Sequence, residues 1–183
     1  MDTFTPTTSE PSAALLNSVE AFLRNGHPQL HDPAPPTWAD GDPCPSGHFT
    51  LPAGLYLYRD NIPQEAQTPY LLIGIAGDCE RHVPDDDRVW DIPLVLHLVQ
   101  NRDTYESDDT PEVLKQLQND LFADAAITSP SYTAYPAAER LSTSVLHVYY
   151  IFDVRLQKSE LFNGHPAHTL LAKIRCAGIT PES

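Results

Sequence analysis

The chain has 183 residues and a formal net charge of −14, from 11 Lys and Arg against 25 Asp and Glu. This length fits a single domain over residues 1–183, and a composition of 41% apolar and 20% charged residues excludes disorder of the whole chain. The acidic balance excludes nucleic-acid binding as the main task, because a surface that grips phosphates needs clustered cations. The 18 prolines, about twice the usual share, exclude an all-helical bundle.

Other features of the sequence predict a protein of the reducing cytosol with no membrane partner. No apolar run reaches the roughly 18 residues of a membrane-spanning helix, and the polar N-terminus lacks the basic stretch and apolar core of a signal peptide. Cys44, Cys79 and Cys176 are odd in number and widely spaced, which argues against a secreted disulfide framework.

The N-terminal third predicts one helix followed by an irregular segment. Apolar residues at helical spacing predict a helix over about 10–24, with Ser9 as its cap and Gly26 at its end. Residues 27–53 have seven prolines and no periodicity, which is long for a connection inside a compact domain. We expect them to form an insertion or arm on the body, anchored by Trp38 and Phe49.

The middle of the chain predicts strands followed by a second helix. Three segments have strand character, and the third contains Pro93, which marks an edge strand or the beginning of a strand. A helix then begins at Thr110 and Pro111 and ends near Asp124, with an apolar stripe on one side. The three predicted strands are 54–58, 70–76 and 89–100.

The C-terminal third predicts a β-hairpin. Residues 125–143 form a connection rich in Pro, Ser and Thr, with one turn of helix at 136–141. Residues 145–156 and 169–176 both alternate, and a turn at Asn163-Gly164 joins them. In the first strand, the alternation places Leu146, Val148, Tyr150, Phe152, Val154 and Leu156 on one face and His147, Tyr149, Asp153 and Arg155 on the other. In the second, Leu170, Ala172, Ile174 and Cys176 face inward and Lys173 and Arg175 face outward.

The order of these elements predicts an α+β fold. Strands and helices are partly segregated along the chain, which disfavours a doubly wound parallel sheet. We expect a mainly antiparallel sheet of four or five strands with two helices packed on one face.

Two Cys/His pairs are the candidate metal ligands. Cys44 with His48, and Cys79 with His82, could together supply a tetrahedral zinc site. The pairs lack the close cysteine spacing of zinc modules, and two loop cysteines with two exposed histidines are the favoured explanation. A small zinc-binding module or metalloenzyme is therefore the alternative function.

The remaining candidates for chemistry are weaker. Asp85, Asp86 and Asp87 carry oxygen ligands for Mg²⁺ or Ca²⁺, but their spacing is that of a solvated acidic loop rather than a calcium loop. Cys79 with His82 is the best candidate nucleophile, yet the sequence offers no third orienting group and no oxyanion pocket. His97, His147 and His165 are explained by strand surfaces and a turn. We expect no catalytic residue, no bound cofactor and no enzymatic activity.

Charge is distributed unevenly along the chain. Residues 80–124 contain twelve acids against four bases, a net of −8, whereas residues 145–178 contain four bases against two acids, a net of +2. A subunit with unlike surfaces can pair head to tail with copies of itself. We therefore expect self-association through Arg155, Lys173 and Arg175 against the acidic middle of a neighbour.

The order of elements resembles the tail terminator family of long-tailed bacteriophages and the related neck and tail-completion proteins. The resemblance rests on three stretches: ALLNSVEAFLRNG, DIPLVLHLVQNRDTYESDD with the helix TPEVLKQLQNDLF, and the strands VLHVYYIFDVRL and TLLAKIRCAGI. It implies a virion protein of the tail or neck, assembled in the host cytoplasm into a ring, usually of six. Its partners would be the tail tube protein and the head–tail connector proteins, and DNA would pass through without specific binding.

Overall fold

The computed structural model of the chain describes residues 5–7, 9–25, 38–45, 51–101, 112–122, 137–162 and 164–180. The helices are α1 (Ser12–Asn25), α2 (Glu112–Leu117), its π-helical continuation η1 (Gln118–Phe122), and α3 (Ala137–Leu141). The strands are β1 (Thr5–Pro6), β2 (Tyr56–Arg59), β3 (Tyr70–Ile75), β4 (Glu80–Val83), β5 (Asp86–Val99), β6 (Leu146–Phe162) and β7 (His165–Thr180).

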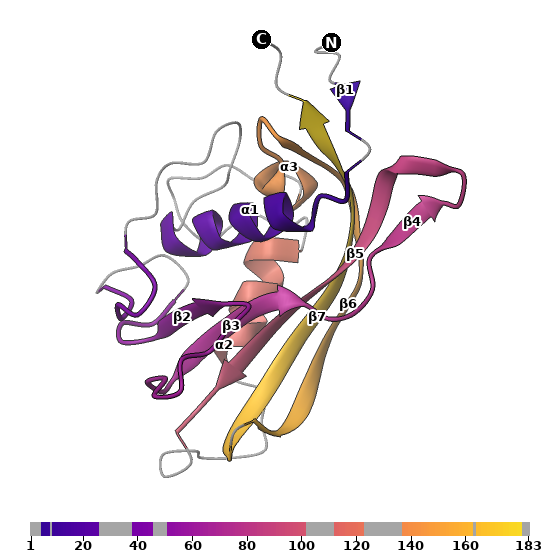
Figure 1. Ribbon diagram of the computed structural model, residues 1–183. Helices are drawn as coiled ribbons and strands as arrows, with labels where there is room; N and C mark the ends of the chain where they lie inside the picture. The colour runs from indigo at the N-terminus through magenta and orange to yellow at the C-terminus, as the bar shows by residue number, and fades with distance from the viewer. Residues whose placement is uncertain are drawn as a thin grey trace.

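The strands form one mixed sheet in the order β1-β7-β5-β3-β2, with β4 paired to β5 and β6 paired to β7 (Figure 1). The predicted α+β class and the mainly antiparallel sheet are confirmed, with one parallel pair, but the seven described strands exceed the four or five expected and the described helices α1, α2 and α3 exceed the two expected. Strands β2 and β3 are parallel, with Tyr56 opposite Tyr70, because residues 60–69 carry the chain back to the start of β2. That connection is rich in turn residues, so its sequence does not distinguish a crossover from a hairpin loop.

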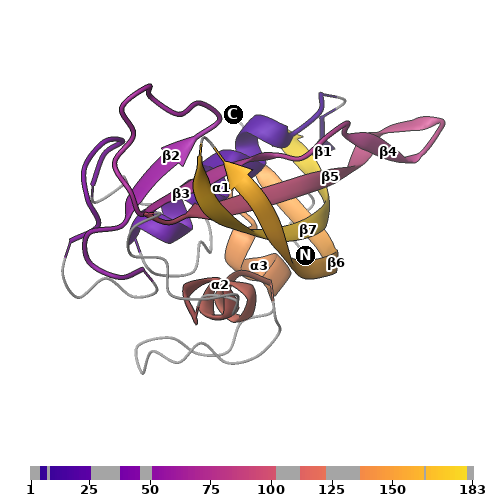
Figure 2. The same ribbon diagram turned by 90° about the horizontal axis from the view of Figure 1, so that it is seen from below.

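The described helices α1, α2, η1 and α3 lie on the same side of the sheet, which we call the inner face (Figures 1 and 2). The main core lies between them and the sheet, and the predicted inward residues of β7 are buried in it. On the opposite, outer face, a smaller apolar cluster packs Ile62 and Ala66 of the β2–β3 connection against Tyr58 and Tyr70. The main core takes Ile92, Leu94, Leu96 and Leu98 from β5, and Leu170, Ala172, Ile174 and Cys176 from β7.

The predicted helix in the N-terminal third is confirmed as α1, with a different cap. The amide of Ser12 donates a hydrogen bond to Oε1 of Glu10 at 2.9 Å, so the Glu10 carboxylate occupies the place expected for Ser9. A carboxylate there also suits the positive end of the helix dipole. α1 has Leu15, Val19 and Phe22 fully buried, as its apolar spacing predicts.

The second predicted helix is shorter in the described residues and widens into a π-helix at η1. The side chain of Arg140, from α3, is fully buried and donates to the carbonyl oxygens of Asn119 and Asp120 at 3.3 and 2.6 Å. These bonds satisfy carbonyls at the end of η1. α3 confirms the predicted turn of helix. Thr110, Pro111 and Asp124 lie outside the described residues.

The proline-rich segment is tied to the body by Trp38, as predicted. Trp38 is 8% exposed, and its Nε1 donates to the carbonyl oxygen of Arg24 at 3.1 Å. Cys44 and Leu51, each 3% exposed, also belong to the main core. The described part of 27–53 therefore contributes to the core. Phe49 lies outside the described residues, and an arm that reaches a neighbour stays a prediction.

The C-terminal hairpin is confirmed, but β6 does not alternate throughout. Bulges between Val148 and Tyr150 and between Phe152 and Arg155 each change which face the following residues occupy. Tyr150 and Phe152 consequently pair with the outward Arg175 and Lys173, so their predicted inward orientation is wrong. Asp153, in the second bulge, has a φ of 50°, which a short polar side chain tolerates.

A second hairpin was not predicted. β4 pairs antiparallel with the first half of β5, and it projects from the body at the right of Figure 1. The segment read as an acidic loop is therefore the end of a two-stranded hairpin, with Asp86 and Asp87 in β5. All of β4 is exposed, so its sequence lacks the apolar alternation that identifies a strand. Among the described residues, none of the helices has the length and apolar character needed to cross a membrane.

Candidate functional site

The outer face carries an ordered set of polar and aromatic side chains over three strands. The register places Asp91 of β5, Arg175 of β7 and Tyr150 of β6 in one row across the sheet. The next row contains Pro93, Lys173 and Phe152, and the one after it contains Val95, Leu171 and Arg155. The three cations predicted from the sequence thus lie on this face, as expected.

Arg175 is fixed by contacts within the subunit. Its Nε and a terminal nitrogen donate to the two carboxylate oxygens of Asp91 at 2.9 and 3.2 Å, which is a bidentate pair. Its guanidinium lies 5.1 Å from the centre of the Phe152 ring, and Phe152 stacks on Tyr150 with ring centres 5.9 Å apart. The hydrogen bonds that Arg175 donates to Asp91 raise the pKa of Arg175 above its ordinary value. Arg175 therefore holds the side chains of this face in place, and its charge is already paired within the subunit.

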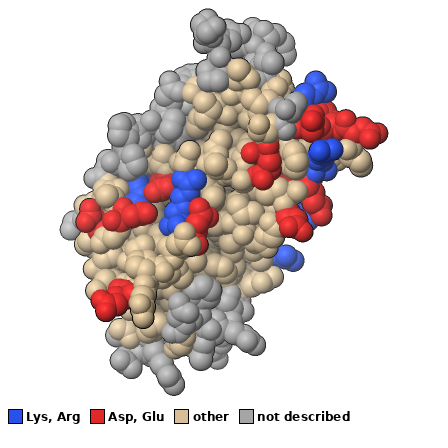
Figure 3. All heavy atoms as spheres, in the orientation of Figure 1, with Lys and Arg blue, Asp and Glu red and all other residues tan. Residues whose placement is uncertain are grey.

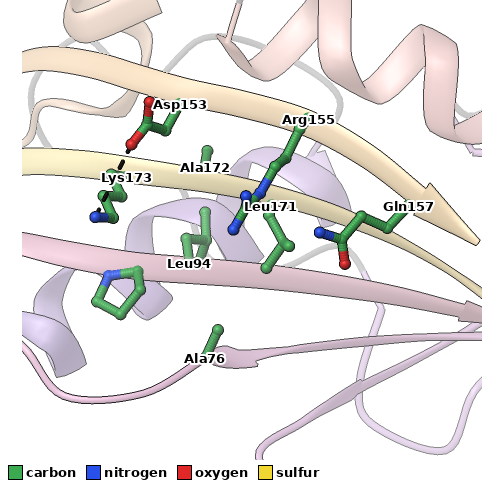
Figure 4. A pocket seen from close by; sticks show the side chains of 9 residues that line it. Ala76, Leu94, Asp153, Arg155, Gln157, Leu171, Ala172 and Lys173 are labelled. Carbon is green, nitrogen blue, oxygen red and sulfur yellow. Dashed lines mark ion pairs between the residues drawn. The ribbon is translucent and has the colours of Figure 1, made fainter. Parts of the chain in front are cut away.

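The outer-face pocket lies beside this stack and has a volume of about 230 Å³. Its floor is apolar, whereas Arg155 and Gln157 extend from β6 across β7 toward Leu171 (Figure 4). Lys173 lies 3.9 Å from Asp153, and no ion pair is formed by Arg155 with any described residue. The pocket is lined by Ala76, Pro93, Leu94, Asp153, Arg155, Gln157, Leu171, Ala172 and Lys173.

The acidic hairpin, residues 80–91, is the second notable surface. It contains five acids against two bases, a net of −3, and acidic side chains gather over it in Figure 3. Asp86 is held by Arg88, whose Nε donates to it at 2.9 Å, and this bonding lowers the pKa of the Asp86 carboxyl group. Val83, at the end of the hairpin, is 47% exposed.

The candidate zinc ligands have separate surroundings. Cys44 is buried and its thiol points at the carbonyl oxygen of Leu51, 3.7 Å away, and burial raises its pKa to about 11. His82 is exposed, with Nδ1 3.8 Å from Asp91. No three potential ligand side chains meet in a metal-binding group within the described part of the chain, and His48 lies outside it.

Cys79, the candidate nucleophile, is partly buried against the core rather than in an open loop. Burial, followed by the nearby Glu10 carboxylate, raises its pKa to about 12. Both effects favour the neutral thiol, which is a poor nucleophile.

His97 and His147 lie in strands β5 and β6, as the sequence predicts. His97 lies on the outer face with Nδ1 2.9 Å from the hydroxyl oxygen of Thr169, and burial lowers its pKa. Burial also lowers the pKa of His147, which packs edge-on against Tyr149.

No family model matches the chain, and no curated protein matches its sequence. The sequence pattern identifies the three cations and places Asp153 on the same face as Arg155, but it gives no indication of Gln157 or of the apolar floor that joins Arg155 and Lys173 in a pocket. Pro93 and Gly77 were the available signals, since both lie where the acidic hairpin leaves the body, Pro93 within β5 and Gly77 between β3 and β4.

Proposed function

We propose that the protein is a structural subunit that associates with its own copies into a closed ring, resembling the tail terminators of long-tailed phages. The observation that carries the proposal is the presence of two unlike surfaces on one chain. One is the open outer face with Arg155 and Lys173, and the other is the projecting acidic hairpin. Unlike surfaces give heterologous contacts, which close into a ring when the rotation between neighbours allows it.

Exposed aromatic side chains on the outer face support the same proposal. Tyr150 is 59% exposed, and it stacks on the partly exposed Phe152, which lies under Arg175. Aromatic residues and Arg are enriched at the centres of protein interfaces, because they bury much area at a small loss of side-chain freedom. This part of the face is therefore suited to contact another protein.

The charge of the subunit suits a ring through which DNA passes. With a net charge of −14 per copy, the lumen of a ring would repel phosphates and would not hold the DNA. We propose a position at the head-proximal end of the tail, between the tail tube protein and the head–tail connector proteins. The protein would thus belong to the virion tail or neck.

The test is the mass of the full-length protein in solution, measured by light scattering after gel filtration and accompanied by electron microscopy. We expect closed rings, with a mass of about 120 kDa if six copies of 20.3 kDa assemble. Raising the salt concentration should weaken the rings, because contacts between exposed charges are screened. A protein that remains monomeric at low salt at every accessible concentration would rule out the proposal.

A further inference from the structure

The outer-face pocket is too small for most free ligands and is shaped for side chains. Its volume of about 230 Å³ lies below the roughly 300–1,000 Å³ of ordinary small-molecule sites. Leu171, Pro93 and Ala76 supply apolar surface, and polar groups come mainly from β6. An apolar side chain next to an acidic one would match both parts of this lining.

Arg155 supplies a positive charge in the pocket that no described acidic side chain neutralises. Lys173 faces Asp153, and Arg175 outside the pocket is engaged by Asp91, but Arg155 is exposed and forms no ion pair with the described residues. A guanidinium group beside an apolar wall binds a carboxylate well, because its fork of donors fits two oxygens and little water competes.

The tip of the acidic hairpin carries the complementary pair. Val83 is one of the few large apolar side chains that are strongly exposed among the described residues, and Asp85 lies two residues further on. Asp86 is engaged by Arg88, whereas Asp85 is exposed and has no ion pair among the residues described. The tip therefore presents an apolar group and an available carboxylate close together.

A subunit cannot fill its own pocket with its own tip. Ala76 and Pro93, which line the pocket, stand at the base of the acidic hairpin, where the Ala76 amide donates to the Pro93 carbonyl oxygen at 2.7 Å. Val83 lies seven residues beyond Ala76, roughly 20 Å away along extended chain, and the hairpin projects from the body (Figure 1). A hairpin tip in this pocket must therefore come from another copy.

We propose that Val83 and Asp85 of one subunit occupy the outer-face pocket of the next, with the Asp85 carboxylate on Arg155. This inference rests on the proposed self-association and specifies its contact. Each tip then reaches the base of a neighbouring hairpin, so the contact repeats head to tail around an assembly.

Charge reversal in full-length protein tests the contact. Asp85→Arg and Arg155→Asp should each weaken association at least about tenfold, and the double variant should recover most of it, because the pair is then restored with opposite polarity. Glu139→Arg is the matched control, since it makes a charge reversal of the same sign at an exposed position of α3, on the other side of the sheet, and should change association much less. Circular dichroism should show that the variants remain folded, because both sites are exposed.

Cross-linking gives a second readout. Subunits carrying Val83→Cys and subunits carrying Gln157→Cys, both in a Cys79→Ser background, should form a disulfide-linked dimer when they are mixed and oxidised. If wild-type rings form while the single reversals leave association unchanged and no cross-link appears, the contact is wrong and the proposed ring stands. A monomeric wild-type protein would overturn both.

Discussion

Arg24 and Trp38 hold each other by reciprocal contacts between α1 and the proline-rich segment. A terminal nitrogen of Arg24 donates to the Trp38 carbonyl oxygen at 3.0 Å, and the Trp38 indole donates to the Arg24 carbonyl oxygen at 3.1 Å. The guanidinium also lies 4.6 Å from the centre of the indole ring and pairs with Glu20 and Asp40. An arginine that is 1% exposed thus joins the helix to an irregular segment.

Replacing Arg24 should be strongly destabilising. Arg24→Met would remove the hydrogen bond that Arg24 donates to the Trp38 carbonyl oxygen and the buried charge that faces Glu20 and Asp40, so we expect a loss of about 3 kcal/mol in the free energy of unfolding. Arg24→Lys should give an intermediate loss, because an ammonium group cannot reproduce the planar fork. Urea denaturation would measure both. Arg59→Ala is the control, since Arg59 shares Glu20 but is more exposed, and should cost at most about 1 kcal/mol.

Gly178 gives strand β1 room to pair with β7. A Cβ atom at Gly178 would lie 2.6 Å from the hydroxyl oxygen of Thr7, whose amide donates to the Gly178 carbonyl oxygen at 2.8 Å. Gly178→Ala should therefore lower the free energy of unfolding by about 1 kcal/mol. In a Thr7→Ala background, the same substitution should cost clearly less. Equal costs in the two backgrounds would show that Thr7 is not the obstacle.

The strand histidines predict a loss of stability on mild acidification. Burial lowers the pKa values of His97 and His147 in the folded protein, so the unfolded chain binds protons more readily below its ordinary pKa of about 6.5. The free energy of unfolding should consequently fall as the pH drops from about 7.5 to about 5.5. Denaturation curves of His97→Gln should show a shallower fall, and adding His147→Gln should flatten it further. A steeper fall in the variants would contradict this assignment.

Cys79 should behave as an unreactive, partly structural thiol. With its pKa raised to about 12, it should react with iodoacetamide near neutral pH at least about a hundredfold more slowly than free cysteine. Because Cys79 packs against the core, Cys79→Ser should cost about 1 kcal/mol, and the exposed His82→Ala less than about 0.5 kcal/mol. A fast alkylation of Cys79, or stoichiometric zinc in the purified protein, would support the alternative function, a zinc-binding module or metalloenzyme.

The sequence by itself predicted the features that depend on local periodicity. The apolar spacing of residues 15–23 identified α1, and the alternation in 169–176 assigned Lys173 and Arg175 to the outer face. These patterns can be read directly because a helix repeats every 3.6 residues and a strand every two. The α+β class followed from the order of such elements.

Only the tertiary structure decided how the elements meet. The parallel pairing of β2 with β3 depends on a crossover that has no periodicity, and the bulges in β6 turn Tyr150 and Phe152 outward against their own alternation. The outer-face pocket likewise combines Ala76 and Pro93 with Arg155, which approach one another only when β5, β7 and β6 are in register. Local propensity sets which face a residue takes within one strand, whereas long-range pairing and packing set which residues become neighbours.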